Sequence, residues 1–420
     1  MQHSLTYIAV EALIKVALLA FVMMTAAAYL VLLERWVAAW VQDRRGPNRV
    51  GVPLTKIKLF GLGQPLADGL KFIFKEEFTP KHVDRWLYTL APLSILAAAL
   101  ASFAVIPMGS SLPPINIPAI GLETDRIQLV EAPSLDVGLV YVFALSSMAV
   151  YGVILGGWAS NNKYSLLGGL RSSAQLIAYE IPLGLGILGI VLASGSLRLE
   201  TICTDQATSG VWNILWQPLG FLVFFVAALA ESARLPFDLP ECEQELIGGY
   251  HTEYAGMRLI LYLIAEFLHM IAAAFLIVIL FLGGWHFWGL TGTDNDVTWL
   301  QAILRIVVLN VKMFGVVVFF MMIRWSWPRF RFDQLMSLGW KVMLPLGLVN
   351  LVAVACFVEY EAPLESKLGG FGSTLLMWGI ALVAWIAAGV LAPLHSDNSA
   401  RKDDFVLDAE RRNRGLRPSA

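Results

Sequence analysis

Residues 257–282 read MRLILYLIAEFLHMIAAAFLIVILFL, an apolar run in which Arg258, Glu266 and His269 are the sole charged or imidazole side chains. A helix that crosses the hydrocarbon core of a bilayer needs about 20 mostly apolar residues. The run meets this requirement and predicts a membrane-spanning helix. Eight further runs meet it as well, at about residues 7–33, 87–107, 136–157, 174–194, 212–230, 302–323, 342–358 and 371–392.

The composition agrees with a membrane protein. Hydrophobic residues make up 57% of the 420 residues and charged residues only 15%, whereas a soluble domain carries about 25% charge. A net charge of −2 leaves no basic excess for nucleic acid. Cys203, Cys242 and Cys356 are too far apart in sequence for a disulfide framework or a cluster-ligand run. We therefore expect an all-α, polytopic membrane protein of about nine spans.

The distribution of Lys and Arg predicts the orientation. With the N-terminus outside, 24 of the 30 basic residues fall in the inner loops and the C-terminal tail, and the outer loops keep Arg126, Arg198 and Lys367. The positive-inside rule then puts the N-terminus in the periplasm and the C-terminus in the cytoplasm. We expect one membrane domain over residues 1–394, a basic tail over 395–420, and no cleavable signal peptide, since the first apolar run is too long for one.

The first inner loop, residues 34–86, is unusually long. RRGPNRVG at 44–51 is a turn sequence that presents arginines around a rigid corner. In GQPLADGLKFIFKEE at 63–77, apolar side chains recur with helical spacing at Leu66, Leu70, Ile73 and Phe74, and Asp68, Lys71 and Lys75 lie on the other face. This pattern predicts an amphipathic helix in the membrane surface, and a plain interfacial anchor is the alternative.

Acidic residues concentrate where a membrane protein normally avoids them. The third inner loop, 230–258, contains Glu231, Asp238, Glu241, Glu243, Glu245 and Glu253. Asp136, Glu180 and Glu266 lie in or at the ends of spans, where ionisable groups are functional candidates by default. Clustered carboxylates share protons, which favours a proton relay. Structural ion pairs are the alternative, and Arg305 and Lys312 are possible partners for Glu266 and His269.

Redox cofactors have no recognisable ligands here. Of the six histidines only His269 lies well inside a span, which excludes a bis-histidine haem between helices. No dinucleotide or nucleoside-triphosphate motif is present. We expect no metal site in this chain, and in a redox enzyme the partner subunits would hold the cofactors.

Four stretches together resemble one family, the H subunit of proton-pumping NADH–quinone oxidoreductase, or respiratory complex I. They are the two motifs of the first inner loop, GGWASNNKYSLLGGLRSSAQLIAYE at 156–180, ESARLPFDLPECEQELIGGYHTEY at 231–254 and RWSWPRFRFDQLMSLGWK at 324–341. They occur in the family's order, and the similarity extends from the first span to about residue 360.

The resemblance implies a membrane subunit without cofactors of its own, in the cell inner membrane or, in a eukaryote, the mitochondrial inner membrane. FMN and iron–sulfur clusters would belong to hydrophilic-arm subunits, and quinone would enter from the lipid. It implies a quinone chamber at Glu34, Arg35, Asp68, Phe237, Arg324, Arg329 and Arg331. It implies a proton path at Asp136, Glu180, Glu231, Glu241, Glu243 and Glu266, and subunit docking at Arg44, Arg45, Asn48 and Arg49.

Two departures from the family pattern accompany the match. The chain has Ser232 and Ala233 where the family reads Thr-Asn, and Cys242 where a small residue is common. Neither removes a charge. Two other hypotheses stay open from the sequence: a membrane subunit of an energy-converting hydrogenase, and a stand-alone proton-coupled transporter. The absence of internal repeats and the size of the inner loops argue against the transporter.

Overall fold

The computed structural model describes residues 5–51, 60–113, 116–117, 122–123, 129–130, 132, 135–238, 248–288, 290–292 and 298–391. Within these residues, 8 helices are long and apolar enough to cross a membrane. They are α1 (Leu5–Val41), α3 (Arg85–Ser102), α4 (Gly138–Ala159), α5 (Lys163–Ser194), α9 (Gly256–Phe281), α10 (Trp299–Ser326), the continuous helix from α11 (Phe332–Ser337) through a π-helical turn (Leu338–Met343) to α12 (Leu344–Glu359), and α13 (Glu361–Leu391). The prediction of a polytopic helical membrane fold is confirmed.

The span expected at 212–230 is shorter than the others. It forms α7 (Asn213–Trp216) and α8 (Pro218–Glu231), with a break at Gln217. Proline lacks the backbone N–H that would continue the helix, so the break falls directly before Pro218. At 1.5 Å per residue, α8 is about 21 Å long, less than the roughly 30 Å hydrocarbon core. Among the described residues there are thus eight candidate spans and one shorter apolar helix, α8.

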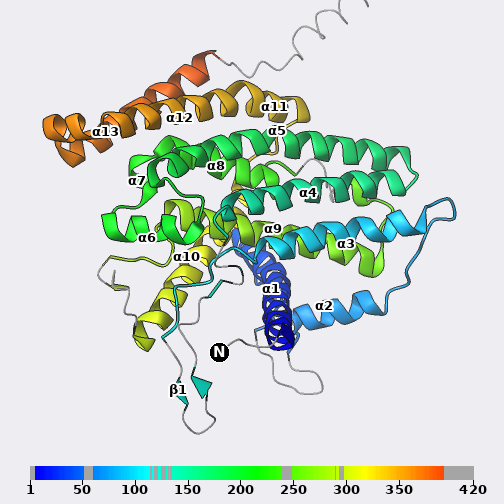
Figure 1. The fold of residues 1–420 in the computed structure, drawn as a ribbon. Helices are drawn as coiled ribbons and strands as arrows, with labels where there is room; N and C mark the ends of the chain where they lie inside the picture. The colour runs from blue at the N-terminus through cyan, green and yellow to red at the C-terminus, as the bar shows by residue number, and fades with distance from the viewer. Residues whose placement is uncertain are drawn as a thin grey trace, which may run out of the picture.

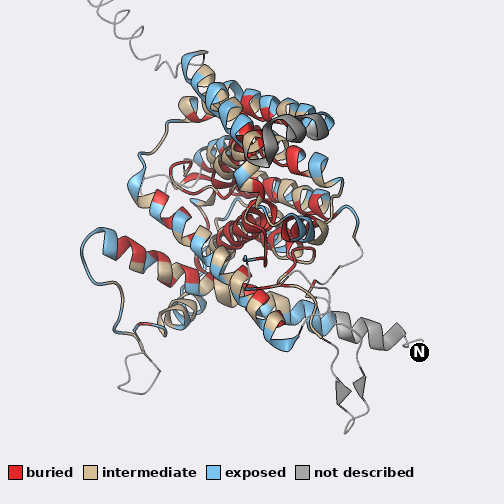
Figure 2. Cartoon of the chain, turned by 90° about the vertical axis from the view of Figure 1, so that its left-hand side faces the viewer, coloured by how far each residue is buried: buried red, intermediate tan, exposed pale blue. Residues whose placement is uncertain are grey.

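Helix α9 is the core of the bundle. Every residue from Met270 to Phe281 is buried, and 78% of its most apolar window is buried against 17% for α1. A helix that is hydrophobic on all sides packs against neighbours all round. Figure 2 shows the buried residues gathered in the middle of the molecule and the exposed ones on the outward helix faces.

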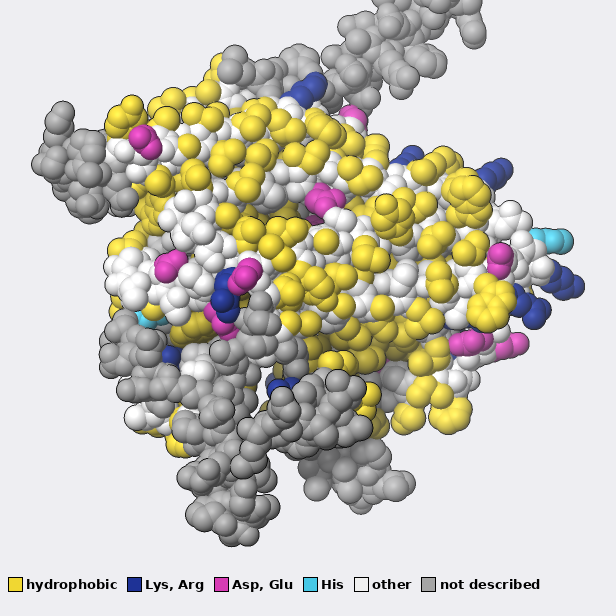
Figure 3. Space-filling view, viewed as in Figure 1, with side chains coloured by type: hydrophobic (Ala, Val, Ile, Leu, Met, Phe, Trp, Pro, Cys, Tyr) yellow, Lys and Arg dark blue, Asp and Glu magenta, His cyan; other side chains and the backbone are white. Residues whose placement is uncertain are grey.

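The remaining helices lie in layers around α9 (Figure 1). In that view α12 and α13 form the top layer, α5 and α8 lie below them, α4 and then α3 with α9 follow, and α1 and α10 lie on the lower side. Figure 3 shows a broad hydrophobic surface over these helices, with Lys and Arg grouped along one edge. Large apolar side chains such as Phe21, Tyr151 and Trp385 are more than half exposed on the molecule's surface, as expected where helices face lipid.

The short elements occupy the connections. The predicted amphipathic helix is present as α2 (Gln64–Ile73), with Pro65 in its first turn and with none of its residues buried. Leu66, Leu70 and Ile73 form its exposed apolar stripe. The other short elements are α6 (Leu199–Ser209), the strand pair β1 (Asn116–Ile117) and β2 (Leu122–Glu123), and the turn Gly249–His251, which precedes α9.

Candidate functional site

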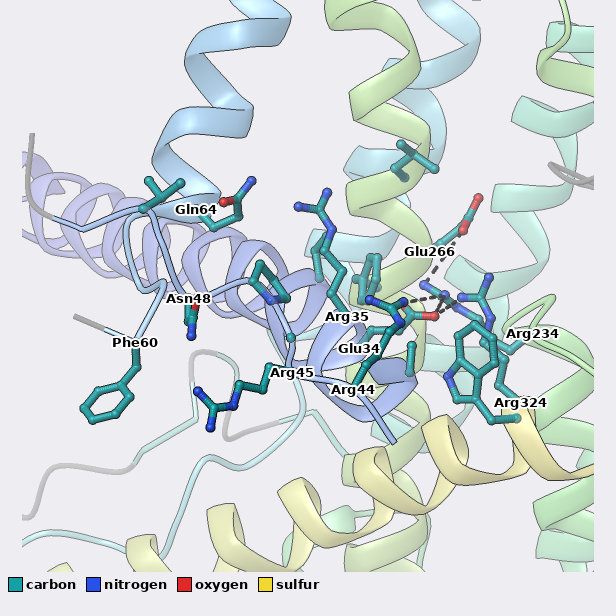
Figure 4. Close-up of a pocket in the computed structure, with 18 of the residues that line it drawn as sticks. Glu34, Arg35, Arg44, Arg45, Asn48, Phe60, Gln64, Arg234, Glu266 and Arg324 are labelled. Atoms are coloured by element: carbon teal, nitrogen blue, oxygen red, sulfur yellow. Dashed lines mark hydrogen bonds and ion pairs between the residues drawn. The ribbon is translucent and has the colours of Figure 1, made fainter. Parts of the chain in front are cut away.

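An open cavity of about 1260 Å³ lies between α1, the corner at residues 44–50, the start of α2, the segment after α8, α9 and the end of α10. Figure 4 shows Phe60, Asn48 and Arg45 at one end of this cavity and Glu34, Arg234, Glu266 and Arg324 at the other. Segments from the first, third and fourth inner loops, far apart in sequence, therefore meet around one space.

The corner at 44–50 is held against α1 by close packing. The indole Nε1 of Trp36 donates a hydrogen bond to the carbonyl oxygen of Pro47 at 3.1 Å. A Cβ atom at Gly46 would lie 2.4 Å from Cδ1 of Trp36, so the corner accepts only glycine there. This rigid turn puts Arg44, Arg45, Asn48 and Arg49, which were expected to dock other subunits, on the cavity wall.

Four charged side chains from four elements form what we call the charge cluster: Glu34 of α1, Arg234 after α8, Glu266 of α9 and Arg324 of α10. Arg234 Nη1 lies 3.2 Å from Glu34 Oε2, and Arg324 Nη1 pairs with the other oxygen of Glu34. Arg234 Nη2 lies 3.9 Å from Glu266 Oε2. None of the four side chains is more than 18% exposed, so each charge depends on the others for its stability.

The guanidinium groups of the charge cluster keep unused hydrogen-bond donors. Arg234 stacks over the ring of Phe267, with Cζ 4.2 Å from the ring centroid. Its Nε and Nη2, and Nε of Arg324, are buried and have no hydrogen-bond partner among the described residues. Leaving a buried donor unpaired costs about 1–3 kcal/mol. Donors of this kind beside an open cavity can bind an oxygen atom of a ligand.

A second, more exposed ion pair joins α1 to the surface helix. Arg35 Nη1 lies 2.6 Å from Asp68 Oδ2, and Gln64 Nε2 donates to the other carboxylate oxygen at 3.2 Å. Arg35 and Gln64 line the cavity. The pair thus fixes α2 along one edge of the cavity.

Four residues that the resemblance assigned to the chamber are not among its lining residues: Asp68, Phe237, Arg329 and Arg331. Asp68 instead holds Arg35, which does line the cavity. Phe237 is 1% exposed and packs between Tyr179 and Phe330, with ring centroids 5.5 and 5.6 Å away. Arg329 donates from Nη2 to the backbone oxygen of Asp238, which itself lines the cavity. Arg331 is exposed at the start of α11. Phe237 and Arg329 thus lie behind the residues that line the cavity.

Two of the predicted intramembrane acids lie together beyond the charge cluster. The hydroxyl of Ser147 donates to Glu180, and that of Ser146 hydrogen-bonds Glu231, which also interacts with the charge of Glu180. Two neighbouring serines of α4 thus hydrogen-bond the carboxyl groups of residues on α5 and α8.

Asp136 lies at the other end of α4. Its carboxylate is 85% exposed and pairs with Arg198 at 3.6 Å, away from the other acids. Glu241 and Glu243 lie outside the described residues. No group of three or more metal-ligating side chains was found among the residues that the structure describes.

Lys312 and Arg305, the possible partners of Glu266 and His269, bind backbone oxygens instead. Lys312 Nζ donates to the backbone oxygens of Leu282, Gly284 and His286 at 2.7, 3.1 and 2.6 Å. Arg305 donates to the backbone oxygens of Thr291 and Gly292 at 3.0 Å. Glu266 has Arg234 instead. The loop after α9 turns back over the helix and brings its carbonyls to these cations.

The sequence-based site did not include Arg234 and the Ser146–Ser147 pair. An arginine directly after an apolar span, in ESARLPF, is the signal that could have found Arg234. Two adjacent serines in the middle of a span are a weaker signal, because serine also packs between helices without a functional role.

Comparisons with known proteins show which family the chain resembles. Residues 14–355 match the family model described as NADH dehydrogenase. One H subunit of NADH-quinone oxidoreductase from Geobacter metallireducens, numbered 1 in that organism, is 46% identical over 340 residues, 81% of this chain and 94% of the relative. The H subunit from Leptospira biflexa is 44% identical over 83% of this chain and 94% of its own length, and the one from Flavobacterium psychrophilum is 42% identical over 84% and 99%.

The extent of the match and the helix content together define the family. The matched region ends before α13 begins, so the last helix lies beyond what the family model covers. The 8 candidate spans among the described residues make the chain a multi-pass membrane protein. It belongs to the family of the H subunits of NADH-quinone oxidoreductase.

Proposed function

We propose that this chain forms the quinone-binding chamber of a proton-pumping NADH:quinone oxidoreductase and couples quinone reduction to proton translocation. The observation that supports this is the open cavity of about 1260 Å³ with the charge cluster at its inner end. The chain carries none of the electron-transfer groups in this proposal. FMN and iron–sulfur clusters belong to hydrophilic-arm subunits, and quinone is the substrate.

The cavity wall suits a molecule that becomes negative during the reaction. Six arginines line it, against the carboxyl groups of Glu34, Asp238 and Glu266. Apolar side chains such as Val31, Leu263 and Phe267 cover other parts of the wall. Ligand sites of this type combine an apolar slot with a few polar groups that set orientation. A quinone takes up two electrons and two protons to become a quinol, and the excess of arginine stabilises the anionic stages of that reduction.

The open side of the cavity is the proposed contact with the hydrophilic arm. Arg44, Arg45, Asn48 and Arg49 lie on the rigid corner at this side, where an incoming subunit that bears the terminal iron–sulfur cluster would close the cavity. This assignment places the corner in the cytoplasm and the N-terminus in the periplasm, in agreement with the distribution of Lys and Arg, and locates the complex in the cell inner membrane.

The proposed proton path leads from the charge cluster through Glu231 to Glu180. Glu231 hydrogen-bonds Ser146, Glu180 accepts from the neighbouring Ser147, and the two carboxyl groups interact electrostatically. Glu241 and Glu243 are assigned to the path by the resemblance. Asp136 lies at the opposite end of the bundle, beside Arg198, and is proposed as part of the outer end of the path.

The test uses the assembled complex with Glu231→Gln and Arg35→Ala. Electron transfer from NADH to ferricyanide should be unchanged, because it does not need this chain. Proton pumping linked to quinone should fall at least fivefold in Glu231→Gln, and quinone reduction severalfold in Arg35→Ala. Glu359→Gln is the matched control, since Glu359 is an exposed carboxylate at the end of α12, and it should pump at the wild-type rate. Normal quinone reduction and pumping in both variants would rule the proposal out.

The two other hypotheses have separate tests. A membrane subunit of a hydrogenase would copurify in mild detergent with hydrogenase subunits, whereas the names of the relatives favour NADH–quinone oxidoreductase. A stand-alone transporter would catalyse pH-dependent solute flux as a purified chain in liposomes, and we expect no such flux.

A further inference from the structure

A second, much smaller cavity lies inside the bundle between α3, α4, α8 and α9. Its volume is about 20 Å³, and one water molecule needs about 10–15 Å³ measured in this way. Five polar residues contribute to a wall that is otherwise apolar: Ser102, Ser146, Glu231, Ser232 and His269. A cavity of this size with several polar partners is suited to a single ordered water.

One buried atom on the cavity wall, Nε2 of His269, has no hydrogen-bond partner in the part of the chain that the structure describes. Buried polar groups in folded proteins are paired with protein or with ordered water in the great majority of cases. A water satisfies Nε2 in either tautomer, because it can accept from Nε2–H or donate to the bare nitrogen.

The other polar groups offer mainly acceptors. The hydroxyl of Ser102 donates to the carbonyl of Ala99 at 2.7 Å, and that of Ser232 donates to the carbonyl of Leu229 at 3.1 Å. Their oxygen lone pairs therefore stay free to accept. The Glu231 carboxyl is the strongest acceptor on the wall. A water that hydrogen-bonds His269 can direct a proton at this carboxyl.

The position of the cavity gives such a water a role. His269 lies three residues after Glu266, so the two side chains are neighbours on one face of α9. Glu231 lies on the far side of the cavity and is linked onward to Glu180. The cavity is thus the gap between the charge cluster and the pair of acids beyond it.

We propose that this cavity holds one water molecule, bound by His269 and Glu231, and that His269 is the positioning residue that joins the charge cluster to the Glu231–Glu180 pair. The proposal rests on the proposed function, which it deepens. When the water accepts a proton from the His269 side, it gives one of its own protons to the Glu231 carboxylate. The water is therefore a neutral water molecule again after each transfer.

The experiment compares His269→Leu, which removes the hydrogen bond, with His269→Gln, which keeps one. In the assembled complex, a high-resolution map should show a water in the cavity of the wild type and of His269→Gln and none in His269→Leu. Protons pumped per NADH oxidised should fall at least fivefold in His269→Leu and stay above half of the wild-type value in His269→Gln. Leu276→Met, a volume-conserving change on the same wall, is the matched control and should keep both the water and the pumping.

A second variant covers the case in which His269→Leu does not assemble, as judged by NADH–ferricyanide activity in the purified membrane complex. Ala273→Val fills the cavity from another part of its wall and leaves His269 in place, and it should lower pumping to a similar extent. Pumping should be the same in Na⁺ and in K⁺ buffers, and a requirement for Na⁺ would assign the cavity to a cation and overturn the proposal.

Two outcomes separate this inference from the proposed function. A dry cavity in the wild type, or wild-type pumping in His269→Leu while Glu231→Gln loses it, overturns the water site alone. Wild-type pumping in Glu231→Gln removes Glu231 from the proton path and overturns the inference, and normal quinone reduction and pumping in both Glu231→Gln and Arg35→Ala overturn the proposed function as well.

Discussion

The two halves of α10 hold their cations in opposite ways. In the first half, Lys312 and Arg305 bind the loop after α9, in what we call the carbonyl clamp: the two side chains and the backbone oxygens of Leu282, Gly284, His286, Thr291 and Gly292. An ammonium group has three donors, and Lys312 uses all three. At the other end, Arg324 and Arg234 share Glu34 in the charge cluster and leave three buried nitrogens without a hydrogen-bond partner among the described residues.

The difference shows how to distinguish a structural cation from a functional one inside a membrane protein. The lysine of the carbonyl clamp is saturated by groups that cannot change charge, and its ammonium lies 4.4 Å from the centroid of the Trp212 ring. The charge cluster is held by carboxylates, which can exchange protons, and it borders an open cavity. Charge alone, which is all that can be read from the sequence, does not separate the two cases. The hydrogen-bond saturation of each group does.

The largest expected effect comes from breaking the charge cluster at its centre. Glu34→Gln leaves Arg234 and Arg324 facing each other without the carboxylate that both contact. Removing one partner of a buried ion pair destabilises a protein by about 3–5 kcal/mol. We expect quinone-linked NADH oxidation by the complex to fall more than tenfold, with ferricyanide reduction retained.

Glu34→Asp is the matched variant, because it keeps the charge on a shorter side chain and should retain part of the quinone activity. If Glu34→Gln oxidised NADH with quinone at the wild-type rate, the charge cluster would be structural, like the carbonyl clamp.

Breaking the carbonyl clamp should affect stability and spare activity. Lys312→Met removes three donors at once and leaves the carbonyls of Leu282, Gly284 and His286 without them. We expect a loss of about 2–4 kcal/mol in stability, visible as a lower melting temperature of the purified complex. Quinone-linked activity per assembled complex should stay near the wild-type level.

Lys341→Met is the control for the clamp, since Lys341 is exposed in the π-helical turn before α12, and its melting temperature should be unchanged. A large loss of quinone activity in assembled Lys312→Met would remove the distinction between the carbonyl clamp and the charge cluster.

The smallest effect is expected from pH, through His286 in the clamp loop. Burial, Lys312 and Arg305 lower the pKa of His286, so the folded state favours the neutral imidazole. The stability that depends on this neutral form is fully present above the unfolded pKa of about 6.5 and is lost as the pH falls below it. The melting temperature should therefore drop between pH 7.5 and 5.5, and less steeply in His286→Gln.

Lys312→Met should also flatten this pH dependence, because one of the two cations that lower the pKa of His286 is gone. Parallel pH profiles in the wild type and in His286→Gln would show that other groups control the acid sensitivity of the complex.

Much of the fold was predictable because apolar length determines where membrane helices lie. The buried helix α9 and the amphipathic α2 both follow from local pattern. The break at Gln217 was missed because residues 212–230 are largely apolar, and hydropathy does not register the missing N–H of Pro218. The family match covers residues 14–355 and could not indicate how α13 packs, with Trp378 Nε1 donating to the backbone oxygen of Leu215.

Most of the residues that form the site were predictable from the sequence, whereas their arrangement in space was less so. Glu34, Arg35, Glu266 and Arg324 all line the cavity, although Glu266 was assigned to the proton path. That Arg234 lies between Glu34 and Glu266 depends on how helices far apart in sequence pack, which no local pattern encodes. The partners of Lys312 were missed for a related reason. Gly283 and Gly284 adopt positive φ angles of 74° and 53°. This turn brings backbone oxygens to Lys312, whereas the sequence suggested only side chains as its partners.

The charge cluster also has a consequence for the biogenesis of this protein. Glu34 is separated from Arg234 by 200 residues, and Arg324 is made later still, so the ribosome releases the carboxylate long before either guanidinium. Until the segment after α8 and the end of α10 are in place, α1 carries an acid without its partners, at an energetic penalty in lipid. We therefore expect the early intermediate to keep the Glu34 carboxyl out of the lipid, and the charge cluster to form only when Arg324 has been made. Translation that stops before residue 324 leaves a chain whose first helix cannot reach its final state, which gives membrane quality control a simple feature to recognise.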